Sequence, residues 1–385
     1  MSCTGIFSSG QEDELIHLEV IQNQPLACST ADNLISATSR LPFITEDRSA
    51  ALNVECFFFD DHCHDEEYFK DIEGNEKNNK NSSKAAPLFL YVHGVCSSAE
   101  TVGVQHIVKQ AKRKRYRVAV LELEGHGLSS GARAVCTDFE RMVDHVTQFV
   151  KHVLKEISKE SVIRSVLSSP KYNSGMSLKK PTTPFILCGS SLGGSLVAYA
   201  ADIMSKTLSQ YPGQFLGVAL IAPAVGVDEK SLPGPITLNA LKLASCITPS
   251  ATISLTPLSD PISYAAPKDS TRNYQGHWPL ATSRMLLDIT SELIKKDIEN
   301  RILTMNKVNS LIVFSGAEDE IVPFESVKEF FESMNAREKA LINVPGEGHD
   351  LMYQNVSATE ILNQIFQWME LRMWAAGRAS GSAHN

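Results

Sequence analysis

The sequence has no excess of positive charge. Its 36 lysine and arginine residues are outnumbered by 44 aspartate and glutamate residues, and the formal net charge is −8. A chain of this charge repels polyphosphate, and proteins that bind nucleic acid usually present a basic face. We therefore expect no nucleic-acid partner.

The sequence also lacks a cysteine framework. Its eight cysteines are scattered singly, with no C-x-x-C pair. This spacing favours free thiols in a reducing compartment over a disulfide scaffold. The cluster His62, Cys63 and His64 has metal-ligand character, but nothing downstream completes a tetrahedral set of ligands. We therefore expect no metal site.

Long apolar runs are missing as well. No stretch approaches the roughly 18 to 20 uncharged apolar residues of a membrane helix. The first residues show no charged segment followed by an apolar core, so we expect no secretory signal. Apolar residues nevertheless make up 43% of the chain, enough to build a core. The sequence predicts a cytoplasmic protein, peripheral to a membrane at most.

The apolar pattern divides the chain into five parts. Residues 1–50 show no sustained periodicity and predict an irregular extension. Alternating strand and helix patterns over 51–221 predict the first part of a parallel α/β core, interrupted by loop insertions near 61–87 and 159–184. Helical patterns without strands over 222–307 predict a cap. The core resumes over 308–377, and 378–385 are expected to form a flexible tail.

Two capping boxes predict where long helices begin. Thr137-x-x-Glu140 precedes an apolar pattern at helical spacing, and Ser357-x-x-Glu360 precedes the last one. The predicted strands lie at 52–60, 88–92, 117–123, 185–189, 216–221, 310–314 and 340–344.

The strongest chemical signal is Gly189-Ser190-Ser191-Leu192-Gly193, extended by Gly194. The pattern G-x-S-x-G between a strand and a helix is typical of a nucleophile elbow, a strained turn that holds the serine hydroxyl clear of the sheet. Glycine is needed on both sides because a side chain there would collide with crowded backbone. The motif alone also fits an ordinary glycine-rich turn, but its position after an apolar strand favours Ser191 as a nucleophile.

A serine hydroxyl needs a base to accept its proton and a carboxylate to orient that base. Asp319 follows the strand at 310–314 in the frame G-x-x-D-x-x-V-P, and His349 follows the strand at 340–344. In an open α/β sheet the active site lies at such strand ends. The chain order Ser, Asp, His is the order found in enzymes that have a nucleophile elbow. The sequence predicts these two residues as acid and base. The rival acids are Glu318, Glu320 and Asp350.

An oxyanion hole requires two backbone N–H donors. One is expected from Leu192, directly after the nucleophile. The other is expected from the loop after the strand at 88–92, where His93 and Gly94 precede Val95 and Cys96. We assign it to Val95, with Cys96 as the alternative. His126, in a second glycine-rich turn, is expected to be structural.

Together these motifs resemble the monoacylglycerol lipase and serine aminopeptidase-like branch of the α/β-hydrolases, over residues 87–372. The matching pieces are His93-Gly94, Glu122-x-x-Gly125-His126-Gly127-x-Ser129, Gly189-x-Ser191-x-Gly193-Gly194, Gly316-x-x-Asp319-x-x-Val322-Pro323 and Gly348-His349. The resemblance implies an α/β-hydrolase fold, with a mostly parallel sheet flanked by helices and an inserted helical cap. It also implies hydrolysis of monoacylglycerol or related lysolipid and carboxylic esters without a cofactor.

The chain departs from the family at two points. It has Glu122 where the family usually has aspartate, and Val95-Cys96 where the family often has a more glycine-rich loop. The second difference bears on the oxyanion hole and on substrate choice.

Two alternatives to ester hydrolysis stay open at this point. The first is an acyltransferase or thioesterase, because a triad does not select its acceptor. The second is a hydrolase-like binding protein without turnover.

The apolar segment 232–249 in the predicted cap either packs on the core or contacts a membrane surface transiently. The oligomeric state is open.

Overall fold

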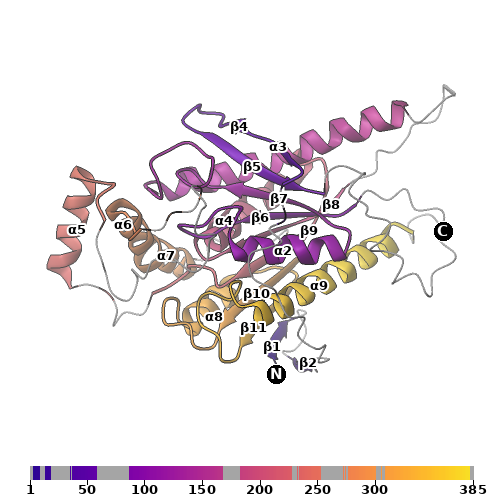
Figure 1. Cartoon of the computed structure of the whole chain (residues 1–385). Coiled ribbons are helices and arrows are strands. Elements are labelled where there is room, and N and C mark those ends of the chain that lie inside the picture. Colours follow the sequence, from indigo (N-terminus) through magenta and orange to yellow (C-terminus); the bar gives the residue numbers. More distant parts are fainter. Residues whose placement is uncertain are drawn as a thin grey trace.

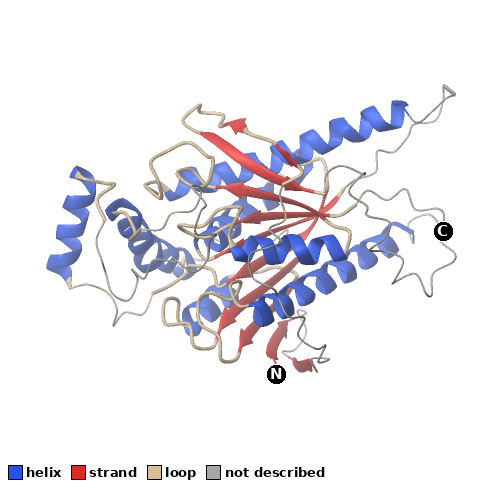
Figure 2. Cartoon of the chain, in the orientation of Figure 1, coloured by secondary structure: helices blue, strands red, loops and turns tan. Residues whose placement is uncertain are grey.

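The computed structural model describes residues 3–8, 14–18, 35, 37–58, 86–167, 183–227, 232, 234–252, 272, 274, 276–300, 305 and 308–381. The described residues form one large sheet with helices on both faces and a separate group of helices at one end (Figures 1 and 2). No helix in these ranges is long and apolar enough to cross a membrane.

Six neighbouring strands of the sheet run parallel. They are β6 (Leu88–Val92), β7 (Arg117–Glu122), β8 (Pro184–Ser190), β9 (Gln214–Ile221), β10 (Ser310–Gly316) and β11 (Glu338–Val344). Antiparallel strands extend both edges: β1 (Cys3–Ser8), β2 (Glu14–Leu18), β3 (Ser39–Arg40), β4 (Phe43–Ile44) and β5 (Ala51–Phe57). The strand order is β2-β1-β11-β10-β9-β8-β6-β7-β5-β3, and β4 pairs with β5.

The parallel strands are buried on both faces, as their continuous apolar runs predict. In β6, Leu88, Leu90 and Val92 join one core cluster, whereas Phe89 and Tyr91 join the other. This alternation follows from the two-residue period of a strand. Helices α3 (Phe139–Leu167), α4 (Leu192–Lys206) and α8 (Phe324–Ser333) cover the first face, and α2 (Val102–Arg113) and α9 (Asn355–Gly381) cover the second.

Helices without strands fill the chain between β9 and β10. They are α5 (Pro235–Ile247), α6 (Leu280–Asp288), the π-helical turn η4 (Ile289–Leu293) and α7 (Ile294–Glu299). They lie beyond the carboxyl ends of the parallel strands (Figure 2). Thr282 joins this group to the core, because its hydroxyl donates to the Ala134 carbonyl at 2.5 Å and accepts the Cys136 N–H.

The N-terminal segment differs from the predicted irregular extension. Strand β1 pairs with β11 and β2, while β3 and β4 pair with β5. Strands β3 and β4 have only two residues each, too few for an alternating pattern, and the β11 partner of β1 lies far away in sequence.

The predicted insertion at 159–184 is shorter than expected, because helix α3 continues to Leu167. The sequence of 159–167 keeps a helical spacing of apolar residues, at 162, 163, 166 and 167, before the glycine and prolines that follow. Residues 168–182, like the predicted loop at 59–85, lie outside the described residues.

Both predicted capping boxes are wrong in position. Asp138, not Thr137, caps α3, since its carboxylate accepts the N–H of Arg141 at 2.9 Å. Ser357 lies inside α9, and its hydroxyl donates to the Glu347 carboxylate. Helix α9 also runs to Gly381, past the predicted start of the tail, while 382–385 lie outside the described residues.

Candidate active site

Ser191 occupies a strained turn between β8 and α4. Its φ is +51° and ψ is −124°, a left-handed backbone conformation that non-glycine residues rarely adopt. Hydrogen bonds hold the turn: the Ser191 N–H donates to Ile221 at 3.0 Å, and the Ser191 carbonyl accepts from Ala224 at 3.0 Å. The neighbouring strand therefore fixes the serine at the carboxyl edge of the sheet.

The glycines around Ser191 are needed for space. A Cβ on Gly193 would lie 2.3 Å from the Val92 carbonyl oxygen and 2.4 Å from that of His93, and one on Gly189 would lie 2.3 Å from the Gly193 oxygen. A Cβ on Gly194 would meet Pro223 at 2.9 Å. The elbow thus packs directly against the end of β6, as the motif predicts.

Ser191, His349 and Asp319 form one continuous chain of hydrogen bonds. His349 Nε2 lies 2.9 Å from Ser191 Oγ, and His349 Nδ1 lies 2.8 Å from Asp319 Oδ2. Asp319 Oδ1 accepts the N–H groups of Ile321 at 2.9 Å and Val322 at 2.8 Å, which fixes the carboxylate. The structure brings together all three residues that the sequence singles out.

Two loops position the acid and the base against each other. The Ala317 N–H donates to Val344 at 3.0 Å, and the Glu318 N–H donates to Glu347 at 2.9 Å. These bonds tie the loop after β10 to the loop after β11. Parallel neighbouring strands end at the same edge, so the tie places Asp319 beside His349.

Burial separates Asp319 from its rivals. Its side chain is fully buried, whereas Glu318 and Glu320 are exposed. Burial acts to lower the pKa of His349, but the hydrogen bond and charge of Asp319 outweigh it and raise that pKa above the ordinary 6.5. Asp350 adds a smaller contribution in the same direction. The imidazolium form of His349 is therefore stabilised by its partner.

The loop after β6 passes beside Ser191. A Cβ on Gly94 would lie 3.0 Å from Ser191 Cβ and 3.6 Å from Ser191 Oγ. The Cys96 N–H donates to His126 Nε2 at 3.1 Å and is therefore not available to a ligand. Of the two alternatives for this loop, Val95 remains the candidate oxyanion donor, together with Leu192 at the first turn of α4.

Two neutral histidines support this loop. His93 Nε2 accepts the Leu123 N–H at 3.2 Å, which leaves Nδ1 to donate to the Gly94 carbonyl at 2.7 Å. His126 Nε2 accepts from Cys96, and its Nδ1 donates to the Glu124 carbonyl at 2.9 Å. Burial lowers the pKa of His93 to about 3 and that of His126 to about 4. Both rings serve as structural hydrogen-bonding groups near neutral pH.

One contact of the elbow has no signal in the sequence. The Tyr91 hydroxyl on β6 lies 2.7 Å from the hydroxyl of Ser190, the residue before the nucleophile. No motif links the two positions, which the parallel pairing of β6 with β8 brings together.

No group of His, Cys, Asp and Glu side chains suited to a metal ion occurs among the described residues, and His62, Cys63 and His64 lie outside them.

Known proteins share both sequence and fold with this chain. The family model for serine aminopeptidase, S33, matches residues 83–167 and 172–355. Monoglyceride lipase of Mus musculus is 22% identical over 254 residues, which cover 66% of this chain and 73% of that protein. Monoglyceride lipase of Homo sapiens is 23% identical over 257 residues, 66% of this chain and 74% of that protein.

Solved structures agree on the fold. A soluble variant of monoglyceride lipase from Saccharomyces cerevisiae, solved with a substrate analogue, matches with a TM-score of 0.61 at 13% identity. The match covers 90% of this chain and 99% of the yeast chain. The mostly parallel sheet with helices on both faces is thus the predicted α/β-hydrolase fold. Since the family model spans most of the chain and includes the segments that carry Ser191, Asp319 and His349, this protein belongs to the serine aminopeptidase S33 family of α/β-hydrolases.

Proposed function

We propose that this protein is a serine hydrolase of carboxylic esters, with monoacylglycerol or lysolipid esters as substrates. The observation that carries the proposal is the chain of hydrogen bonds from Ser191 Oγ through His349 to Asp319. The hydroxyl is within proton-transfer distance of a base, and that base is oriented by a buried carboxylate.

The proposed reaction has two halves. Ser191 Oγ attacks the ester carbonyl while His349 accepts its proton, and the resulting imidazolium then protonates the leaving alcohol. Water, activated by His349, next attacks the acyl-enzyme and releases the acid. Asp319 keeps Nδ1 protonated and stabilises the imidazolium in both halves. The N–H groups of Val95 and Leu192 would stabilise the oxyanion.

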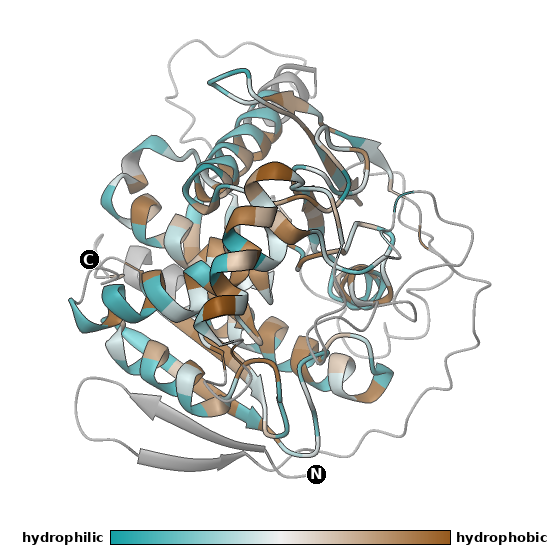
Figure 3. Cartoon of the chain, turned by 90° about the vertical axis from the view of Figure 1, so that its left-hand side faces the viewer, coloured by the Kyte–Doolittle hydropathy of each residue, from teal (hydrophilic) through white to brown (hydrophobic). Residues whose placement is uncertain are grey.

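Two observations support a lipid-like substrate. The mammalian relatives named above are monoglyceride lipases. Helix α5 also presents apolar side chains to solvent, with Ile236 87%, Leu243 65% and Ile247 71% exposed. Figure 3 views the molecule from the side on which α5 lies and shows its hydrophobic segments.

A fluorophosphonate probe tests the nucleophile. We expect the protein to be labelled, and Ser191→Ala to lose labelling and ester hydrolysis together. A panel of monoacylglycerols, lysophospholipids and acyl-CoA then separates lipase from thioesterase activity, and added alcohol acceptors reveal acyl transfer. Labelling that persists in Ser191→Ala would remove the proposed nucleophile, and labelling without turnover of any ester would favour the binding-protein reading.

The acidic side of the pH profile tests the base. Only neutral His349 accepts a proton, so activity is lost as pH falls through its pKa. Because Asp319 raises that pKa, kcat/KM should fall at a higher pH than the 6.5 of an ordinary histidine. In Asp319→Asn the midpoint should move to lower pH, in addition to the loss of rate. Profiles of kcat/KM for both proteins measure the shift, and an unmoved midpoint would contradict the assignment.

We also propose that α5 contacts lipid surfaces. Replacing Ile236, Leu243 and Ile247 with serine should reduce binding to phosphatidylcholine vesicles about tenfold, because apolar burial drives such contact. Turnover of a short, water-soluble ester should stay within about twofold. Leu371→Ser on α9 is a matched control, since Leu371 is 58% exposed but lies on another helix. Equal vesicle binding by all three proteins would refute a docking role for α5.

A further inference from the structure

Two carboxylates are buried side by side on the paired strands β5 and β7. Glu122 is 0% exposed and Glu55 is 1% exposed. The strand register sets Asn53 opposite Glu122, and the Asn53 amide donates to both carboxylates at 2.9 Å. Buried carboxylates are costly unless they are paired and hydrogen-bonded. Their partners therefore indicate what this cluster holds in place.

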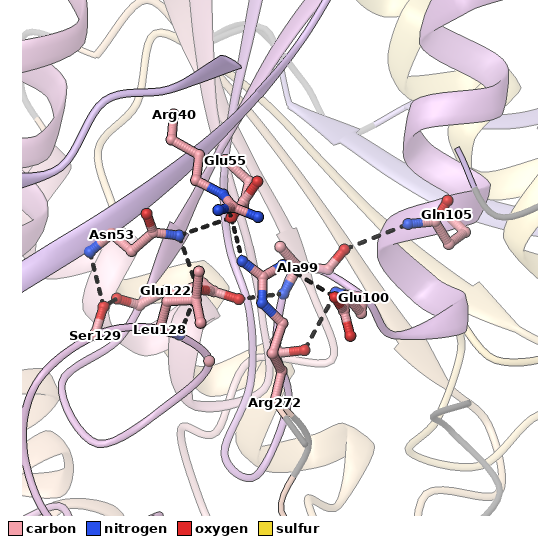
Figure 4. Close-up of polar contacts among 12 residues, drawn as sticks. Arg40, Asn53, Glu55, Ala99, Glu100, Gln105, Glu122, Leu128, Ser129 and Arg272 are labelled. Atoms are coloured by element: carbon pink, nitrogen blue, oxygen red, sulfur yellow. Dashed lines mark hydrogen bonds and ion pairs between the residues drawn. The ribbon is translucent and has the colours of Figure 1, made fainter. Parts of the chain in front are cut away.

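Glu122 organises two loops near Ser191. Its Oε1 accepts the N–H of Ala99 at 3.1 Å, and its Oε2 accepts the N–H of Leu128 at 2.7 Å. Ala99 ends the segment from Gly94 that carries the candidate oxyanion donor. The longer side chain at the position where the family usually has aspartate thus reaches the backbone of that loop (Figure 4).

Arg272 supplies the buried positive charge of this cluster, and it comes from the chain between β9 and β10. Its Nη2 donates to Glu55 Oε1 at 2.5 Å, and its Nη1 donates to Glu100 Oε1 at 3.1 Å. The arginine side chain is 10% exposed. Burial opposes its charge, but Glu122 and Glu55 raise the pKa of Arg272, so the guanidinium stays charged.

Glu55 also binds a second arginine, which is far more exposed than Arg272. Arg40 Nε donates to the same Glu55 Oε1 at 2.9 Å, but its side chain is 59% exposed and comes from β3. Arg272, by contrast, links the chain between β9 and β10 both to Glu55 and to Glu100, the residue next to Ala99.

We propose that Arg272 is a positioning residue that sets the oxyanion loop from the cap. The guanidinium holds Glu100, and Glu122 holds the adjacent Ala99 N–H, so the end of the loop is fixed on two sides. The segment Gly94 to Ala99 then keeps the Val95 N–H beside Ser191. The expected effect on kcat rests on the proposed function. The expected effect on the position of the loop rests on the contacts alone.

The kinetic test compares two variants that break the contact between Arg272 and Glu100 with a third that removes a different arginine from Glu55. Arg272→Gln and Glu100→Ala should each lower kcat about 10- to 100-fold with a smaller change in KM, because a displaced oxyanion donor acts on the transition state. Arg40→Gln, which also removes one cation from Glu55, should stay within about twofold of wild type. Because the two residues act through one contact, the double variant should lose little more than either single variant.

A second readout does not need activity. Cys96 is 6% exposed within the loop, and Cys188 is 0% exposed on β8. Alkylation by N-ethylmaleimide, followed by peptide mass spectrometry, should increase several-fold at Cys96 in Arg272→Gln and Glu100→Ala but stay unchanged at Cys188 and in Arg40→Gln. Increased alkylation at both cysteines would mean general loosening and would overturn the proposal, as would kcat values equal to that of Arg40→Gln.

The two proposals fail differently. If wild type shows no Ser191-dependent turnover, the proposed function falls, while the alkylation pattern still judges Arg272. If wild type is active, but kcat and the alkylation of Cys96 are both unchanged in Arg272→Gln and Glu100→Ala, the positioning role is refuted and the proposed function stands. Should Arg272→Gln fail to fold, Glu100→Ala decides the outcome, since Glu100 lies at the surface end of the contact with 27% of its side chain exposed.

Discussion

Replacing His349 with alanine is expected to lower kcat for the proposed ester hydrolysis by about 10⁵- to 10⁶-fold, as loss of the base does in characterised Ser-His-Asp enzymes. The imidazole is the group that contacts Ser191 Oγ, at 2.9 Å, and it also has to protonate the leaving alcohol. Steady-state turnover of a monoacylglycerol and of a short ester measures the loss. The melting temperature should fall by a few degrees at most, because the buried Asp319 carboxylate loses its imidazole partner but keeps the Ile321 and Val322 N–H donors.

His277→Ala provides the control for this experiment, because the His277 side chain is exposed and belongs to the chain between β9 and β10 rather than to the triad. Its kcat should match wild type. Should His349→Ala keep more than about 1% of the activity while Ser191→Ala keeps none, another group would have to accept the serine proton, and the assignment of the base would be wrong.

The second large effect concerns folding of the elbow. Gly193→Ala is expected to destabilise the protein by about 3–5 kcal/mol or to prevent folding, because the added Cβ would approach two backbone oxygens. Those oxygens belong to Val92 and His93, at 2.3 and 2.4 Å, and neither can move without displacing the end of β6 or the turn. Urea unfolding measures the change in the free energy of unfolding.

Gly234→Ala is the matched control, since a Cβ there has nothing within 4 Å and the residue has φ −58°. Its unfolding free energy should stay within about 1 kcal/mol of wild type. Equal stability of the two variants would show that the contact between elbow and strand is looser than the distances indicate, and fluorophosphonate labelling of Gly193→Ala would then be normal.

The sequence predicts the parallel core well because its signals are local. Each of the six parallel strands coincides with a predicted one to within a few residues, since buried strands form unbroken apolar runs between turn residues. The positions of Ser191, Asp319 and His349 follow from the same source. Each lies in the segment that follows the carboxyl end of a strand, and parallel neighbours end at a common edge.

Other features depend on distant partners and could not be predicted. Strand β1 pairs with the distant β11, whereas β3 and β4 pair with nearby β5 but have only two residues each, too few to form a pattern. The capping error at Thr137 has a different origin, because the next residue, Asp138, is itself a favoured N-cap residue and accepts the Arg141 N–H, so the helix begins one residue later. Arg272 has no motif at all. Its two carboxylate partners, Glu55 and Glu100, lie 217 and 172 positions away in the sequence.

The pairing of β1 with β11 has a consequence for biosynthesis. Thr4 lies opposite Asn343, so β1 is synthesised long before the strand with which it pairs. Until then the edge of β1 is unpaired on the ribosome, and unpaired edges are templates for wrong association. A bulky group fused next to β1 is thus expected to slow maturation of the nascent chain more than one placed after α9, and a chaperone that shields β1 would be needed until β11 has been synthesised.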